Sequence, residues 1–299
     1  LGGAAAASFV DLEYDHPGPR PSYGIAGFTK DGKAVIAHHR YDEWTLPLDG
    51  SAPTALTSGA GDKNEIRFRI VRVDPVDMTI PRSVGPRGTI DLSRPITLST
   101  YGEWTKKAGF SEAAGGQLKS LVWEDAAYSV PVKAMKADRY LFTRQTFVEF
   151  PDLRVSGPDF KDSKKITRTN PQQAEYLWGH RILFDFKNKD GLRLQGILAI
   201  PDDYKPGEKR PMLVSFYEAN SQNLNRFLLP GHNYIEPPVV NEGGGIAVFA
   251  TLGMARAAVD INVALLRHQL DALALLQDAD VGERIAVDRD DIGDLAGLQ

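Results

Sequence analysis

The chain has 299 residues, of which 42% are hydrophobic and 25% are charged, a composition typical of globular proteins with a sizeable core. Its 35 basic and 39 acidic residues are interspersed and give a formal net charge of −4, so neither nucleic acid nor an anionic membrane surface is expected as a partner. The chain has no run of 18 apolar residues that would predict a membrane span, and without cysteine it forms no disulfide or thiolate site.

The first 175 residues are predicted to form short β-strands separated by turns. The segment DGKAVIAHHRYDEWTLPLDGSAPTALT, residues 31–57, contains two D-G turns, two strands and a closing Leu-Thr. A similar order recurs in ADRYLFTRQTFVEFPDLRVSGPDFKDSKKIT, residues 137–167, which closes on Ile-Thr. These copies favour blades of a β-propeller, about three or four of them, which is fewer than a closed ring of short blades usually needs. A generic antiparallel β domain is the alternative.

From about residue 176 the pattern becomes that of an α/β domain. RILFDF and LRLQGILAIP flank Asn-Lys-Asp-Gly, residues 188–191, which predicts a hairpin, and the alternation from Leu192 to Ile200 predicts one buried face. PMLVSFY and GIAVFAT are continuous apolar runs, typical of parallel strands covered on both faces. The apolar spacing from Val259 to Leu273 predicts an amphipathic helix, and ERIAV a further short strand.

Few residues qualify as a nucleophile, a base or a metal ligand. No G-x-S-x-G nucleophile elbow occurs, and Ser58 and Ser156 are interpreted as turn residues because neither follows an apolar strand that leads into a helix. The six histidines show no H-E-x-x-H spacing, so we expect neither a metal site nor a cofactor. His232 is interpreted as a loop residue and His268 as an exposed helix residue. The run EGGG, residues 242–245, is interpreted as a flexible connection.

One long segment resembles a known family. FKNKDGLRLQGILAIPDDYKPGEKRPMLVSFYE, residues 186–218, resembles the entry into the hydrolase domain of the prolyl oligopeptidase family of serine peptidases, particularly its glutamyl endopeptidase-like and dipeptidyl peptidase-like members. LTSGAGDKNEIRFRIV and PITLSTYGEWTKKAGF also resemble family sequence. The resemblance implies a mixed fold, in which the C-terminal blades of a β-propeller occupy residues 1–175 and the N-terminal part of an α/β-hydrolase domain occupies residues 176–299.

The resemblance also implies roles for residues at the end of the PMLVSFY strand. Tyr217 matches the family tyrosine that donates its hydroxyl to the oxyanion formed when a serine attacks the peptide carbonyl. Taken without the family, Tyr217 would simply end a strand with its hydroxyl in solvent. Glu218, Asn220, Ser221 and Gln222 either line the substrate cleft beside it or cap the loop, and both alternatives stay open.

The resemblance predicts a serine-type peptidase that hydrolyses short peptides through an acyl-enzyme. Its Ser, Asp and His would lie outside this chain, so these 299 residues would be an inactive portion of a longer peptidase. A non-catalytic, propeller-containing binding protein with a degenerate hydrolase domain is the alternative, suggested by the acidic DRDDIGD, and an esterase or lipase is a third possibility. The family favours a bacterial periplasmic or secreted location, and the sequence predicts no oligomeric state.

Overall fold

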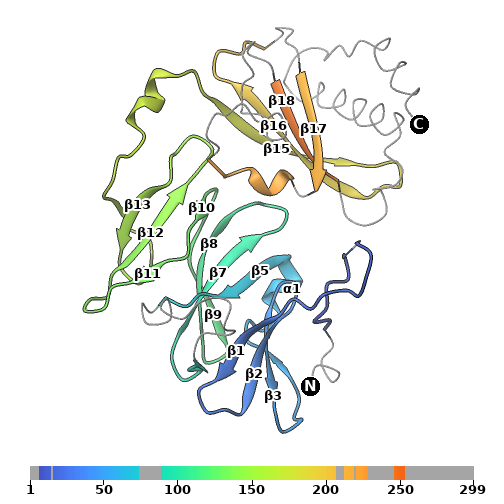
Figure 1. The fold of residues 1–299 in the computed structure, drawn as a ribbon, viewed down its shortest axis with the longest axis vertical. Coiled ribbons are helices and arrows are strands. Elements are labelled where there is room, and N and C mark those ends of the chain that lie inside the picture. The colour runs from blue at the N-terminus through green and yellow to red at the C-terminus, as the bar shows by residue number, and fades with distance from the viewer. Residues whose placement is uncertain are drawn as a thin grey trace. The chain divides into compact units, whose positions relative to one another are not determined.

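The computed structural model describes residues 7–14, 16–73, 89–206 and 220–227, and the backbone of residues 212–218 and 246–252 (Figure 1). These residues divide into two compact units. The first unit holds the described residues up to Pro171 together with Asn225–Phe227, and the second holds those from Gln172 to Leu224 together with residues 246–252. Within the described part of the chain, no helix has the length and apolar character that crossing a membrane requires.

The first unit consists of three small sheets whose strands are mainly antiparallel (Figure 1). The strand orders are β4-β3-β2-β1-β6, β5-β7-β8-β9 and β10-β12-β13-β14, with β11 also paired to β12, and no sheet among the described residues closes on itself. A short helix, α1 (Ala60–Asn64), connects β4 to β5. The strands are β1 (Ile25–Thr29), β2 (Ala34–His38), β3 (Glu43–Pro47), β4 (Thr54–Ala55), β5 (Ile66–Ile70), β6 (Thr89–Ile90), β7 (Ile96–Gly102), β8 (Ala108–Ala114), β9 (Gln117–Glu124), β10 (Ala127–Tyr128), β11 (Val132–Lys133), β12 (Tyr140–Gln145), β13 (Asp152–Ser156) and β14 (Lys164–Lys165).

Both sequence repeats fold into the same order of strands. Residues 31–57 contain β2, β3 and β4, and residues 137–167 contain β12, β13 and β14, each strand antiparallel to the next. The two D-G turns of the first repeat place Gly32 and Gly50 at φ values of 71° and 85°, which glycine adopts without a Cβ clash. The strands predicted for these two segments are therefore confirmed.

The Leu-Thr and Ile-Thr that close the two repeats have the same structural role. Thr57 donates its hydroxyl to Asp42, which precedes β3, and two backbone amides of α1 donate to the same carboxylate at 2.8 Å. Thr167 donates in the same way to Asp152, the first residue of β13, at 2.8 Å, and 15 residues separate the two partners in both repeats. The aspartates are only 1% and 2% exposed. Because a buried carboxylate needs partners, each threonine fixes the end of its repeat to the strand beside it.

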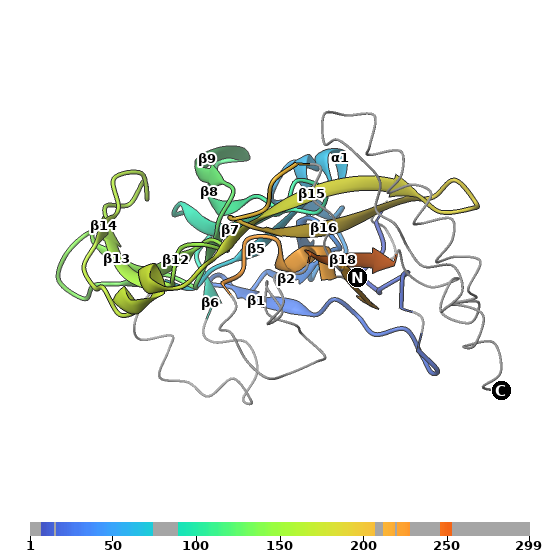
Figure 2. The ribbon, with the colours of Figure 1, turned by 90° about the horizontal axis from the view of Figure 1, so that it is seen from above.

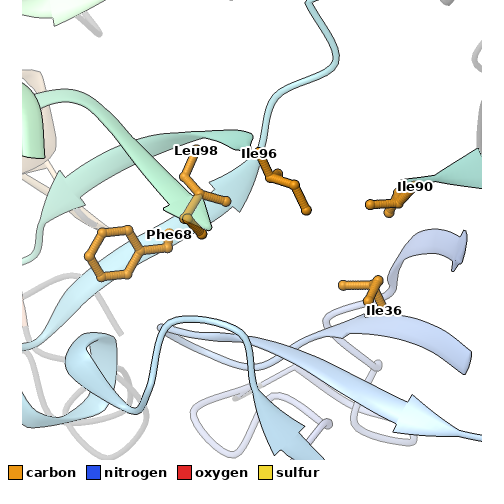
Figure 3. Close-up of a cluster of buried hydrophobic side chains, with 6 residues drawn as sticks. Ile36, Phe68, Ile90, Ile96 and Leu98 are labelled. Atoms are coloured by element: carbon orange, nitrogen blue, oxygen red, sulfur yellow. The ribbon is translucent and has the colours of Figure 1, made fainter. Parts of the chain in front are cut away.

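Neighbouring sheets of the first unit share apolar cores. Figure 3 shows the first core, in which Ile36 of the first sheet packs with Phe68 and Leu98 of the second. A second core joins the second sheet to the third, where the rings of Phe110 and Phe160 lie 4.5 Å apart. The second sheet therefore shares one apolar core with the first sheet and another with the third.

The second unit begins with a long hairpin and continues as a mixed sheet. A 3-10 helix, η4 (Pro171–Glu175), precedes β15 (Gly179–Lys187) and β16 (Arg193–Pro201), which pair antiparallel along their whole length (Figure 2). The strand order is β15-β16-β18-β17, and β17 (Met212–Glu218) and β18 (Ile246–Leu252) are parallel. The predicted hairpin and parallel strands are confirmed. The predicted helix from Val259, the ERIAV strand, the EGGG run, His232 and His268 lie outside the described residues.

The prediction of a single buried face on β16 is wrong. Gln195, Ile197 and Ala199, which alternate with the predicted set, are 3%, 0% and 0% exposed, whereas Leu192 is 57% exposed. The physical reason is that the turn η5 (Asn220–Asn223) contacts β16, and Arg181, which lies opposite Ala199, hydrogen-bonds to that turn, so the alternate face is also covered. Leu192 precedes the strand and lies in the hairpin turn.

Candidate functional site

The end of β17 lies in a row of polar residues that crosses the second-unit sheet. Tyr217 is opposite Thr251 of β18, Thr251 is opposite Gln195 of β16, and Gln195 is opposite Asp185 of β15. Tyr217 and Glu218 are the last two residues of β17. In open α/β sheets, ligands bind outside the carboxyl ends of the parallel strands, and this is the end at which Tyr217 is placed.

Gln195 is a polar residue buried in the middle of this sheet. Its side-chain Nε2 donates to Asp185 Oδ1 at 3.0 Å, and Asp185 also forms an exposed ion pair with Arg193 at 2.9 Å. Since a buried amide left without partners costs free energy, the carboxylate of Asp185 stabilises Gln195 in its buried position. Gln195 and Asp185, the two residues of the row that belong to the hairpin, are therefore joined by a side-chain hydrogen bond.

The amide-rich segment after β17 forms a compact turn on this sheet. Residues 220–223 form η5, which contacts β16 and β18, and Ser221 is fully buried. The Nη1 of Arg181, in β15, donates to the carbonyl oxygen of Asn223 at 2.6 Å. Burial of the guanidinium lowers the pKa of Arg181 to about 10. The chain leaving β17 is therefore fixed to the sheet within a few residues.

The predicted site residues lie at the end of β17 and in η5, but only some of their side chains are described. Tyr217 and Glu218 have described backbones, but their side chains lie outside the described part of the chain. Asn220 and Gln222 are half-buried in η5, and their contact with a substrate stays a prediction. The sequence analysis did not single out Arg181. Its position as a charged residue at the start of the apolar run RILFDF could have indicated it.

The two serines that sequence analysis assigned to turns differ in the structure. Ser58 lies in a turn with a φ of 55°, and its hydroxyl donates to the carbonyl of Gly116 at 2.9 Å. Ser156 is the last residue of β13 and is buried, so its assignment to a turn is wrong. Its hydroxyl donates to the adjacent carbonyl of Gly157, because a buried hydroxyl at a strand end needs a local acceptor.

A second group of charged residues lies in the first unit. Arg144 donates through Nε and Nη2 to the two oxygens of Glu124, both at 3.0 Å, and through Nη1 to Glu149. Arg154 donates to Glu149 at 2.6 Å, and Tyr128 donates its hydroxyl to Glu124. The hydrogen bonds from Arg144 hold the pKa of Glu124 below its ordinary value. Because these cations and carboxylates neutralise one another, the group connects strands of the third sheet to β9 and stabilises the fold.

Across the described ranges, no three His, Asp or Glu side chains come together in a way that could hold a metal ion. The His38–Glu43 pair lies in the first sheet, where His38 Nδ1 is 2.8 Å from the buried carboxylate of Glu43. Glu43 also accepts the backbone amide of Ile70 at 3.1 Å. This pair therefore joins β2 and β3 to β5.

No protein-family model matches the chain, and no curated protein is similar to it. The fold is similar to that of a number of solved structures, among them two peptidases. Porphyromonas gingivalis dipeptidyl peptidase 4 is 14% identical with a TM-score of 0.56, and the match covers 87% of this chain and 36% of that one. Pyrococcus horikoshii acylaminoacyl peptidase is 11% identical with a TM-score of 0.53, covering 89% of this chain and 40% of that one. The chain thus has a fold similar to that of less than half of each peptidase.

Proposed function

We propose that this chain is a portion of a serine peptidase of the prolyl oligopeptidase type. Residues 1–175 would supply blades of a β-propeller, and residues 176–299 would supply the first part of an α/β-hydrolase domain. The sheets of the first unit that share apolar cores, and the parallel β17 and β18 of the second unit, support this division. The observation that carries the proposal is a tyrosine at the carboxyl end of a parallel strand, in a fold similar to two peptidases.

In the proposed reaction, a serine supplied outside these 299 residues attacks the peptide carbonyl carbon through its Oγ. A histidine takes the serine proton and returns it to the leaving amine as the C–N bond breaks, which leaves an acyl-enzyme that water hydrolyses. Tyr217 donates its hydroxyl to the oxyanion that forms at each addition step. Short peptides are the proposed substrates, because a propeller in the complete protein would restrict access to its catalytic centre.

The test uses the complete protein that contains this sequence, assayed on short peptide amides and on simple acyl esters. Replacement of Tyr217 by phenylalanine removes one oxyanion donor, so we expect kcat to fall about 100-fold while KM changes little. Tyr176→Phe is the matched control, because Tyr176 is 67% exposed and precedes β15. An unchanged kcat in Tyr217→Phe would contradict the assigned role.

The same assays separate the alternatives. A fluorophosphonate probe is expected to label one serine of the complete protein, and peptide amides are expected to be cleaved. Cleavage of esters alone would support an esterase. Absence of both labelling and hydrolysis would support a binding protein with a degenerate hydrolase domain.

A further inference from the structure

Arg181 is a charged residue on an otherwise largely apolar part of the sheet. It lies opposite Ala199, and two positions further along the hairpin Leu183 lies opposite Ile197, so these residues share one face. Ala199 and Ile197 are both fully buried. Placing a guanidinium on this face costs desolvation free energy, as the lowered pKa of Arg181 indicates. A cation is retained at such a position when its hydrogen bonds offset that cost.

The acceptor of Arg181 is a carbonyl at the end of a turn. The last carbonyls of a helical turn have no partner within it, and in η5 the amide of Leu224 already bonds to Ser221. The carbonyl of Asn223 therefore needs an outside donor, which Arg181 provides at 2.6 Å. A charge-assisted hydrogen bond of this length is among the stronger ones in proteins.

The turn that Arg181 holds begins two positions after the end of the strand that carries Tyr217. Asn223 is six positions beyond Tyr217, and Ser221, between them, is fully buried. We propose that Arg181 is a positioning residue: by holding the carbonyl of Asn223, it fixes η5 and so the end of β17 from which Tyr217 reaches the oxyanion. This inference rests on the proposed peptidase function and adds a residue that acts through Tyr217 without contacting the substrate.

The expected loss of rate depends on how far the hydrogen-bond donor can move before it no longer stabilises the oxyanion. A donor must lie about 2.7–3.1 Å from the oxyanion, and a misplacement of about 1 Å can reduce the rate of a reaction by up to about 100-fold. Loss of the Arg181 contact loosens η5 without removing Tyr217. We therefore expect kcat to fall about tenfold, with KM within about twofold of its original value.

The experiment compares Arg181→Met and Arg181→Lys with the matched control Arg193→Met in the complete protein. Arg193 lies on the same hairpin but is exposed and pairs with Asp185. Hydrogen exchange of the segment 219–224 is expected to speed up about tenfold in Arg181→Met and to stay unchanged in the control. Arg181→Lys keeps a cationic donor, so it is expected to restore most of the protection and of kcat. Arg181→Gln replaces Arg181→Met if the latter does not fold, with an expected intermediate loss of both.

A double variant shows whether Arg181 acts through Tyr217. If it does, Arg181→Met added to Tyr217→Phe lowers kcat by less than about twofold, because the donor is already absent. A further tenfold loss would contradict the inference, since Arg181 would then act independently of Tyr217. Unchanged exchange of residues 219–224 in Arg181→Met or Arg181→Gln would also overturn it, whatever the activity. A normal kcat in Tyr217→Phe alone would instead overturn the proposed function.

Discussion

The buried aspartate of the third sheet offers the sharpest test of how the repeats are held together. Asp152 Oδ1 accepts the hydroxyl of Thr167 at 2.8 Å and both the amide and hydroxyl of Thr169 at 2.9 Å, while Oδ2 accepts Lys165 at 2.6 Å. Asp152→Ala removes every acceptor, whereas Asp152→Asn keeps Oδ1 as a neutral acceptor but replaces Oδ2, the acceptor of Lys165, by an NH2 group that can only donate. The two variants are therefore expected to differ strongly.

The magnitude follows from the kind of hydrogen bond that each variant loses. A hydrogen bond to a charged group contributes about 1.5 kcal/mol or more to the free energy of unfolding, so the three on Oδ1 together contribute about 4.5 kcal/mol or more. The ion pair with Lys165 contributes about 1 kcal/mol, because the lysine side chain is 39% exposed. We expect Asp152→Ala to lower the local free energy of opening by about 5 kcal/mol or more, because it removes the three hydrogen bonds and the ion pair. We expect Asp152→Asn to lower it by about 2 kcal/mol, because the ion pair is lost and the three remaining hydrogen bonds become neutral.

Hydrogen exchange of β13 and β14 measures this local free energy, which a global melt would average over two units. Asp159→Ala is the control, because Asp159 is exposed and accepts only the amide of Lys161 in the same turn, at 3.3 Å. Equal effects of Asp152→Ala and Asp159→Ala would refute the reasoning.

Acid provides a second check on the same carboxylate. Burial raises the pKa of Asp152, but the hydrogen bonds from Lys165, Thr167 and Thr169 outweigh it and hold the pKa below its ordinary value. A depressed pKa in the folded state means that the stabilisation is present above the ordinary aspartate pKa of about 3.9 and is lost as the pH falls further. The difference in stability between the native protein and Asp152→Asn is therefore expected to shrink below about pH 4. A constant difference would show that the charge of Asp152 is irrelevant.

Two further substitutions test the cores and the charged group of the first unit. Gly109→Ala would place a Cβ 1.8 Å from the carbonyl oxygen of Val122, so we expect the free energy of unfolding measured in urea to fall by about 3 kcal/mol. Gly157→Ala is the control: its Cβ would lie 3.8 Å from Asp159 Oδ1, an ordinary contact, so we expect a change of under about 0.5 kcal/mol. Arg144→Met leaves Glu124 and Glu149 without their shared cation, and we expect about 2 kcal/mol less stability because Glu124 is 39% exposed. Arg139 is exposed, so we expect Arg139→Met to change the free energy of unfolding little. Equal urea midpoints for the two arginine variants would contradict the role of Arg144.

The sequence predicted those parts of the fold that depend on neighbouring residues. The D-G turn at Asp49 and Gly50 and the hairpin at residues 188–191 require local backbone conformations that only a few residue types favour, and both form as expected. The continuous apolar runs likewise predicted the parallel pair of β17 and β18. Local patterns of this kind gave the strands, and the resemblance suggested Tyr217.

Contacts between distant residues were not predictable in this way. Arg181 and Asn223 are 42 positions apart, and their hydrogen bond exists only because η5 folds onto the sheet. Burial of Gln195 was missed for the same reason, since alternation in one strand does not show what covers its other face. The parallel pairing of β6 with β1 also joins segments that no local pattern relates.

The order β15-β16-β18-β17 has a consequence for how the chain folds during synthesis. β18 leaves the ribosome after β17, yet it must insert between β17 and the hairpin. Until residue 252 has emerged, the inner edge of β16, from Gln195 to Ala199, has unpaired backbone groups beside apolar side chains, a surface that other nascent strands can pair with. A chaperone or a pause in synthesis would therefore protect this edge of the second unit until the sheet is complete.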